Sequence, residues 1–139
     1  MFGSLDISTS GLVAQRTRLD VIAGNIANMY ATRGPHDEPG PYQRRVALLA
    51  SGDPAAGRHA PGVHVQSIIR DPSPFRKVHD PSHPDAIKTG PDAGYVLFPN
   101  VDYATEMINA LQASRAYEAN VTVMEISKTI AAGALRVVA

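Results

Sequence analysis

The C-terminal stretch, residues 101–138, carries the longest regular hydrophobic pattern in the chain. Apolar or small residues return there in alternating steps of three and four. The resulting predicted seam consists of Met107, Ala110, Ser114, Tyr117, Val121, Met124, Lys128, Ala131, Leu135 and Val138. This heptad-like spacing predicts a long helix that winds left-handedly around a partner helix. At about 1.5 Å per residue, its roughly 38 residues would span on the order of 57 Å, so it needs a long surface to lie against.

A second apolar stripe lies on the opposite side of the same predicted helix. It comprises Ala116, Ala119, Val123, Ile126, Ile130 and Val137. A helix that is apolar on two sides is usually buried between neighbours, so one partner helix is not enough. Lys128 alone clearly interrupts the first stripe, and we expect its charged end to reach water or an acidic neighbour. Asn100 and Asp102 are the candidate N-caps of this helix.

Residues 4–30 predict the first helix, with Ser4 as its N-cap. The apolar stripe of this helix consists of Leu5, Leu12, Leu19 and Ile26, widened by Ile22 and Met29. Gly11 and Gly24 each cost about 1 kcal/mol inside a helix, which predicts either close helix contacts or a break at those points. Because this helix is the shorter of the two, it covers only part of the last helix, and the remainder would meet other subunits.

Asn25 and Asn28 are three residues apart and so share one face of the first predicted helix. Two interpretations stay open for this pair. The asparagines are either exposed polar residues near a helix end, or a register-setting pair in an assembly contact, as a buried Asn is in coiled coils.

The middle of the chain differs from both ends, because all eleven prolines and all five histidines lie between Pro35 and Pro99. Proline excludes long helices there. Strand-like runs occur at residues 42–50, 63–69, 75–78 and 95–98, and loop-forming clusters at 34–41, 51–62, 71–74, 80–84 and 89–94. We therefore predict an α+β fold with a coiled-coil-like pair of long terminal helices and a small, irregular β-rich central module. Its three parts are residues 1–33, 34–100 and 101–139.

Composition narrows the function classes. Thirteen basic residues balance thirteen acidic ones, so the net charge of zero gives no reason to propose nucleic acid as a partner. There is no cysteine, and no apolar run is long enough for membrane insertion. The start, MFGSLDIST, has an acid at Asp6 and no basic residue before Arg16, which is not a Sec-type signal peptide.

Candidate chemistry is concentrated in the histidine- and aspartate-bearing loop around His79, Asp80, His83 and Asp85. This segment is proline-rich rather than helical, and no further ligands follow at a recognisable metal-site spacing. We expect these to be loop residues, with no catalytic residue, cofactor or metal. The basic pairs at residues 44–45 and 76–77 are expected to face solvent or an acidic neighbour. A coiled-coil adaptor or dimeric binding module, and a small hydrolase using this loop, stay as alternatives.

Three blocks of sequence together resemble bacterial flagellar rod and hook proteins. GLVAQRTRLDVIAGNIANMYATR (residues 11–33) resembles their N-terminal signature, and SRAYEANVTVMEISKTIAAGAL (114–135) their C-terminal motif. DPSPFRKVHDPSHPDA (71–86) and GYVLFPNVD (94–102) resemble the middle of a short member of that family. The chain departs from the family pattern at Gly24, where an Asn is usual.

The resemblance implies a structural protein of the proximal rod, the drive shaft of the flagellum. Such a subunit would be exported by the flagellar type III apparatus without a cleaved signal peptide. Its expected partners are other rod proteins, copies of itself, and the inner-membrane ring and adaptor at the rod base. The helices would pack into the wall of a helical tube. The expected assembly residues are Leu5, Leu12, Leu19, Ile22, Asn25, Ile26, Asn28, Met107, Ala110, Ser114, Tyr117, Val121, Val123, Met124, Ile126, Ile130, Ala131, Leu135 and Val138.

Overall fold

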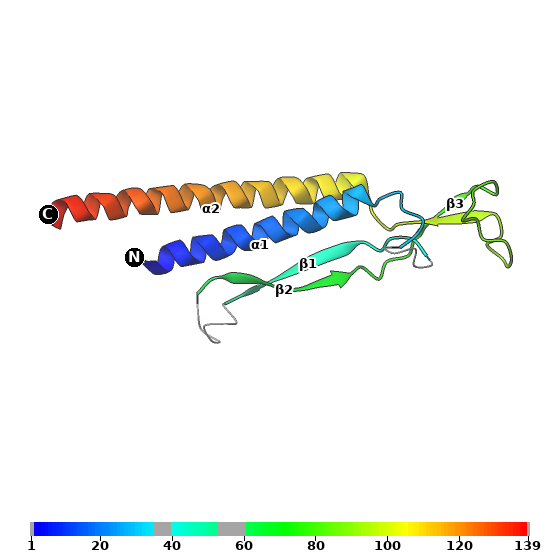
Figure 1. The fold of residues 1–139 in the computed structure, drawn as a ribbon, viewed down its shortest axis with the longest axis horizontal. Helices are drawn as coiled ribbons and strands as arrows, with labels where there is room; N and C mark the ends of the chain where they lie inside the picture. The colour runs from blue at the N-terminus through cyan, green and yellow to red at the C-terminus, as the bar shows by residue number, and fades with distance from the viewer. Residues whose placement is uncertain (1, 35–39, 53–60, 139) are drawn as a thin grey trace.

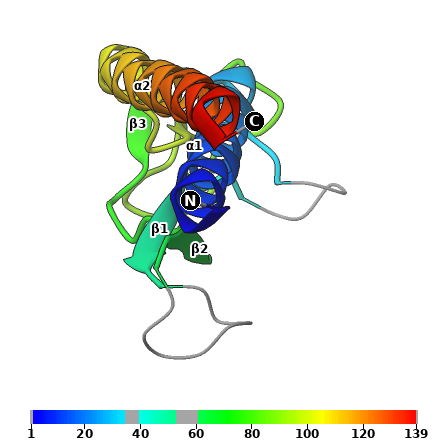
Figure 2. The ribbon, with the colours of Figure 1, turned by 90° about the vertical axis from the view of Figure 1, so that its left-hand side faces the viewer.

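Two long helices lie side by side and antiparallel, with a β-rich middle at one end and beneath them (Figures 1 and 2). The computed structural model describes residues 2–34, 40–52 and 61–138. The elements in chain order are α1 (Phe2–Ala27), β1 (Arg45–Ser51), β2 (Val63–Arg70), β3 (Arg76–His79), β4 (Tyr95–Phe98) and α2 (Tyr103–Val138). The predicted α+β class, with long terminal helices and a small β-containing middle, is confirmed.

The helix ends differ from the predictions in detail. Ser4 lies inside α1 rather than at its N-cap, because the helix already begins at Phe2. Asp102 caps α2: its Oδ2 accepts a hydrogen bond of 2.8 Å from the N–H of Thr105. This bond satisfies one of the first N–H groups of the helix, which have no partner inside it. Asn100 is not the cap, since its side chain bonds elsewhere.

The four predicted strands are all present, but they form two separate antiparallel sheets of two strands each. β1 pairs with β2 from Arg45↔Arg70 to Ser51↔Val63, with a bulge between Leu48 and Leu49. β3 pairs with β4, and this second hairpin lies beyond the end of the helix pair (Figure 1). The predicted loops at 34–41 and 51–62 fall partly outside the described residues.

The buried apolar core is thin. Its members in the described chain are Ala14, Ile22, Tyr42, Val96, Val101 and Ala113, and the polar residues Ser8, Asn25 and Glu106 are buried with them. Small and polar side chains therefore supply much of the buried contact, and hydrogen bonds must satisfy the polar ones. No helix in the described ranges is both long enough and apolar enough to cross a membrane.

The line of closest contact between α1 and α2 is not the predicted seam. On α1 the buried positions share one face of the helix and are Ser8, Gly11, Ala14, Ile22 and Asn25. On α2 the contact line runs through Glu106, Ala113 and Asn120. A Cβ on Gly11 would come within 2.8 Å of Asn120 Nδ2, so the predicted close approach at Gly11 is confirmed. At Gly24 the prediction is wrong, because nothing lies within 4 Å and the helix continues.

The large apolar residues of the predicted stripes border this contact line instead of forming it. Met107 and Val121 each come one position after a contact-line residue, Glu106 and Asn120. Met107 is 46% exposed and Leu135 is 73% exposed, whereas Ala113 is fully buried. Small side chains allow the two backbones to approach closely, and this leaves the longer side chains at the rim.

Candidate assembly interface

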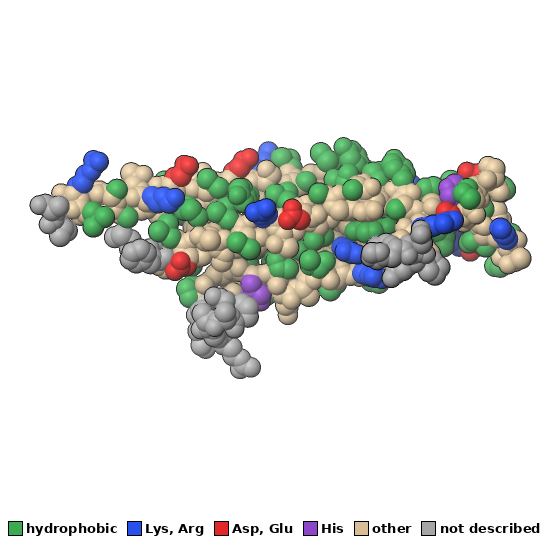
Figure 3. All heavy atoms as spheres, in the orientation of Figure 1, with side chains coloured by type: hydrophobic (Ala, Val, Ile, Leu, Met, Phe, Trp, Pro, Cys, Tyr) green, Lys and Arg blue, Asp and Glu red, His purple; other side chains and the backbone are tan. Residues whose placement is uncertain are grey.

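α2 exposes many large apolar side chains, some beside its contact line with α1 and others on the opposite side of the helix. Figure 3 shows hydrophobic side chains gathered along this helix, most densely near its start. The exposed residues are Tyr103, Met107, Ile108, Leu111, Tyr117, Val123, Ile126, Ile130 and Leu135. Contiguous exposed apolar surface of this kind marks sites where a protein contacts another protein. The second stripe predicted from the sequence is thus accessible at Val123, Ile126 and Ile130.

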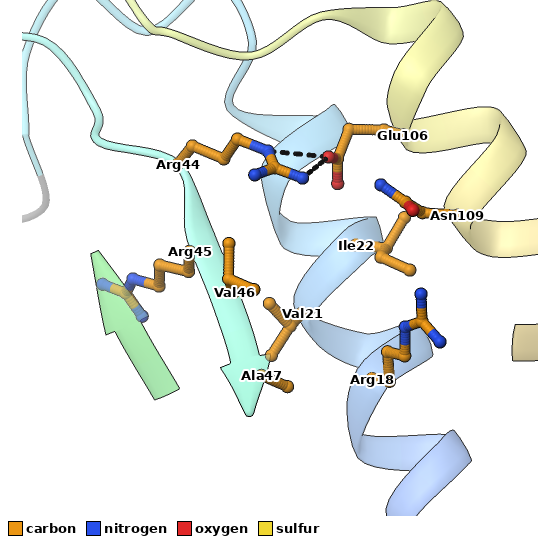
Figure 4. A pocket seen from close by; sticks show the side chains of 9 residues that line it. All are labelled: Arg18, Val21, Ile22, Arg44, Arg45, Val46, Ala47, Glu106 and Asn109. Atoms are coloured by element: carbon orange, nitrogen blue, oxygen red, sulfur yellow. Dashed lines mark hydrogen bonds and ion pairs between the residues drawn. The ribbon is translucent and has the colours of Figure 1, made fainter. Parts of the chain in front are cut away.

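A buried polar cluster joins α1, the start of β1 and α2. Figure 4 shows its contact between Arg44 and Glu106. We call Asn25, Tyr42, Arg44 and Glu106 the polar junction. Asn25 is 1% exposed and Glu106 is 0% exposed. Buried polar groups of this kind are costly unless their hydrogen bonds are made, so the partners of each group decide what the cluster does.

The carboxylate of Glu106 is held on both oxygens. Arg44 donates from Nε and Nη2 to Oε1 at 2.9 and 2.7 Å, and Asn25 donates from Nδ2 to Oε2 at 2.9 Å. Figure 4 shows the Arg44 side chain reaching from the start of β1 towards α2. A guanidinium in this double contact both neutralises the buried charge and fixes its direction.

The amide of Asn25 uses all four of its hydrogen-bonding positions. Besides Glu106, Nδ2 donates to the carbonyl of Arg45 at 2.8 Å. Oδ1 accepts from the N–H of Arg45 and from the hydroxyl of Tyr42, both at 2.9 Å. One side chain on α1 is therefore bonded to α2, to the backbone of β1 and to the residue Tyr42 before that strand.

The outer part of the junction is closed by Asp71 and Asn100. Arg44 Nη1 donates to Asp71 Oδ2 at 3.0 Å, and the N–H of Arg44 donates to Asn100 Oδ1 at 2.8 Å. Hydrogen bonds from Ser73, and then from Arg44, lower the pKa of the Asp71 carboxyl. Burial raises the pKa of the Tyr42 phenol. Arg44 is thus paired with two carboxylates, Asp71 and Glu106.

A cavity of 120 Å³ lies next to the junction, between α1, β1 and α2. Figure 4 shows its lining: Arg18, Val21, Ile22, Arg44, Arg45, Val46, Ala47, Glu106 and Asn109. The one carboxylate in this lining, Glu106, is already paired, and no nucleophile stands beside a base. The arrangement fits a structural contact between segments better than acid–base chemistry.

The structure separates the expected assembly residues by burial. Asn25 is inside the subunit, while Asn28 donates from Nδ2 to the carbonyl of Gly24 at 2.8 Å, within its own helix end. Ile22 is buried. The half-buried residues are Leu5, Leu12, Leu19, Ile26, Ala110, Ser114, Val121, Met124 and Ala131. The exposed residues are Met107, Tyr117, Val123, Ile126, Ile130 and Leu135, together with Lys128. Val138 belongs to α2, but its side chain lies outside the described part.

The histidine-bearing loop is occupied by local contacts. The His79 ring lies edge-on to Tyr95 at 5.0 Å between centroids. Asp85 accepts from Arg33 Nη2 at 2.7 Å and from Thr32 Oγ1 at 2.8 Å. Within the described ranges, no group of three His, Cys, Asp or Glu residues is placed to hold a metal ion.

Sequence reasoning missed the role of the junction residues other than Asn25. Arg44 looked like half of an isolated basic pair, and Glu106 is an acid in the first turn of α2, where the helix dipole already favours one. Arg44 and Glu106 are 62 positions apart, so no local pattern joins them.

Comparison with known proteins agrees with this structure along the chain. A family model described as "Flagella basal body rod protein" matches residues 5–35, and one described as "Flagellar basal body rod FlgEFG protein C-terminal" matches residues 92–137. The flagellar basal-body rod protein FlgC of Borreliella burgdorferi is 41% identical, with 99% of this chain and 97% of the relative covered.

Two further relatives carry the same name. FlgC of Bacillus subtilis is 40% identical over 98% of this chain and 97% of its own length. FlgC of Salmonella typhimurium is 40% identical over 90% of this chain and 88% of its own length. The chain therefore belongs to the FlgC family of flagellar basal-body rod proteins.

Proposed function

We propose that this chain is a structural subunit of the proximal rod of the flagellar basal body, where it packs its helices into the wall of a helical tube. The observation that carries the proposal is the apolar side of α2, which α1 leaves uncovered in a chain whose relatives are rod proteins. A neighbouring helix laid on the side of the second stripe would bury Val123, Ile126 and Ile130. Head-to-tail contacts of this kind build an open helical array when their rotation does not close a ring.

The expected assembly residues divide by their place in this scheme. Exposed ones such as Val123, Ile126 and Leu135 would meet neighbours directly. Half-buried ones such as Leu12 and Val121 border the α1–α2 contact line and would be covered further on assembly. Many parallel helix contacts give the stiffness that a torque-transmitting shaft needs, and no bond-making chemistry is required.

The partners follow from the same role. They are other rod proteins, copies of this chain, the inner-membrane ring and adaptor at the rod base, and the flagellar type III export apparatus. Export would leave the N-terminus uncleaved. Mass spectrometry of the protein from isolated basal bodies tests this: an intact N-terminal peptide is expected, and a shortened one would contradict export without cleavage.

Val121→Asp tests the assembly surface. The new carboxylate would be buried without a partner when neighbours pack, so we expect rods to be lost while secretion continues. The matched control is Thr122→Asp, one position along and exposed, which should leave rods intact. Swimming and basal-body isolation give the result. Normal swimming by Val121→Asp, or equal loss in both variants, would remove Val121 from the interface.

The loop histidines provide a test of the hydrolase alternative. Replacing His79 and His83 by Ala removes two ring contacts at the surface. We expect motility, secretion and rod assembly to be unchanged. Loss of motility with normal rods would bring an activity of this loop back into consideration.

A further inference from the structure

We propose that Asn25 sets the register of the subunit: it fixes the axial position of α1 against α2 and of the β1–β2 hairpin against both. Its amide has two donors and two acceptors in one plane, and all four are used. The partners also dictate its orientation. Glu106 and the Arg45 carbonyl only accept, and the Arg45 N–H only donates, so the amide fits one way round.

Apart from Ile22 and Asn120, most of the other residues where the helices meet are small and do little to choose a register. Gly11, Ala14, Ala110 and Ala113 are small, and small residues repeat along both helices. Small side chains spaced by three and four can meet in several nearly equivalent positions. In coiled coils a single buried Asn removes this ambiguity, because every other register leaves it unpaired.

A slide of one turn would have a defined cost in hydrogen bonds. It would bring Ile22 or Val21, or else Asn28 or Met29, to the place of Asn25. The apolar residues cannot pair with Glu106, and Asn28 lies past the last residue of α1, Ala27. Glu106 Oε2, the Tyr42 hydroxyl and both backbone groups of Arg45 would then lose a partner, and of these groups Glu106 and Tyr42 are buried.

The hairpin is tied at a second place, near its far end. Ser10 Oγ accepts from the N–H of Val63 at 3.1 Å, 15 residues before Asn25 on the same helix. β1 is thus anchored at Arg45 and β2 at Val63. Once Asn25 has fixed the helices, these two anchors fix the height of the hairpin as well.

The consequence for rod assembly depends on the proposed function, whereas the register does not. A fixed register keeps the exposed residues of α2 and of the hairpin at constant relative heights. A neighbour that touches both elements would find the same surface on every copy. A subunit with a shifted register would present a mismatched surface without being unfolded.

Cysteine cross-linking in the purified full-length chain tests the register, since the natural sequence contains no cysteine. A Cβ at position 11 would lie 3.2 Å from Asn120 Cγ. Gly11→Cys with Asn120→Cys therefore reports the native register. Gly11→Cys with Ala116→Cys or with Met124→Cys reports a slide of one turn in either direction.

Asn25→Leu is the test variant, because leucine keeps the bulk and removes all four bonds. We expect the 11–120 disulfide yield to fall at least about threefold and one of the shifted pairs to rise. Asn28→Leu is the matched control: it makes the same change one turn later and should leave the 11–120 yield unchanged. Tyr42→Phe removes one of the four bonds and should also keep the register.

Three outcomes would overturn the proposal. The first is an unchanged 11–120 yield in Asn25→Leu. The second is a loss of all three disulfides together with helical circular dichroism, which would make Asn25 merely stabilising. The third is an equal loss in Asn28→Leu. Absence of the chain from basal bodies would defeat the proposed function and leave the register result standing.

Discussion

The two hairpins are similar in construction but differ in how they are held. The β1–β2 hairpin lies along α1 and is anchored by Asn25 and Ser10 through bonds to its backbone. The β3–β4 hairpin comes close to neither helix within the described chain. Its strand β4 contributes the buried Val96, and its polar contacts are exposed, such as the ion pair of 2.7 Å between Lys77 and Asp92. The comparison shows that pairing strands is a local matter, whereas placing a hairpin depends on distant polar residues.

The difference has an energetic side. Buried, fully paired hydrogen bonds are expensive to break, whereas exposed ion pairs contribute little because water and salt screen them. The first hairpin should therefore open together with the helix pair, and the second should open separately and at lower cost. Of the four changes below, Glu106→Ala and Asp85→Asn test this contrast, and the two glycine changes test the helix contacts to which the first hairpin is anchored.

The largest effect is expected for Glu106→Ala. It leaves the Arg44 guanidinium and the Asn25 amide without their shared partner, and we expect a loss of about 3 kcal/mol in the free energy of unfolding. Denaturant unfolding measures the loss, and hydrogen exchange locates it in α1, α2 and β1–β2. The exposed Glu118→Ala is the control. If Glu106→Ala reduced the protection from hydrogen exchange equally in both hairpins, the proposed difference between them would be wrong.

A smaller loss is expected for Gly11→Val. The new side chain meets Asn120, whose Nδ2 lies 2.8 Å from the first added atom. Overpacking of this kind costs about 2 kcal/mol. Thermal unfolding measures it, and adding Asn120→Ala should restore part of the loss if the two positions are in contact. Strict additivity of the two changes would argue against this contact.

Gly24→Ala should act in the opposite direction. A Cβ at this position meets nothing within 4 Å, so the helix should gain up to about 1 kcal/mol in unfolding free energy. Thermal unfolding of Gly24→Ala measures this gain, as it measures the loss in Gly11→Val. A destabilised Gly24→Ala would mean that the free subunit already has a close contact at this corner.

Asp85→Asn tests the second hairpin alone. Bonds from Arg33, and then from Thr32, lower the pKa of the Asp85 carboxyl below its ordinary value of 3.8. A lowered folded-state pKa means that this stabilisation is present above the ordinary value and is lost as pH falls through the folded-state pKa. The protection factors of the β3–β4 amides, which are corrected for the intrinsic pH dependence of exchange, should therefore fall on acidification from about pH 5 downwards.

In Asp85→Asn this pH dependence should be reduced, and exchange in the helix pair should be unaffected. If Asp85→Asn instead shifted the midpoint of global unfolding, the β3–β4 hairpin would not open separately from the helix pair, and the contrast between the hairpins would be wrong. Asp80→Asn, in the same loop, is the matched control, because its bonds to Ser82 are local.

Local pattern predicted the elements well and the contacts between them less well. Heptad spacing, proline placement and strand alternation located both helices and all four strands to within a few residues. The helix contact line was misplaced because it consists of small and polar residues such as Gly11, Asn120 and Glu106, which the apolar stripe does not mark. Large apolar side chains dominate a hydrophobic pattern even where they lie at the rim.

The candidate site was only half predictable for the same reason. Asn25 stood out beside Asn28, yet nothing in the sequence distinguished a buried amide from an exposed one. The partners that decide the matter, Arg44 and Glu106, come from segments whose adjacency is a result of the fold. The exposed stripe of Val123, Ile126 and Ile130 was predicted, since periodicity alone reveals it.

The antiparallel arrangement also decides how the subunit responds to force. Both chain ends lie at one end of the helix pair and the polar junction lies at the other (Figure 1). A pull on the two ends peels the helices apart turn by turn, which needs far less force than sliding them past each other. The contact between Gly11 and Asn120 separates early, Ala113 follows, and the Asn25–Glu106 contact separates last. We therefore expect the free subunit to unfold at a lower force when its two ends are pulled than when it is sheared along the helix axes.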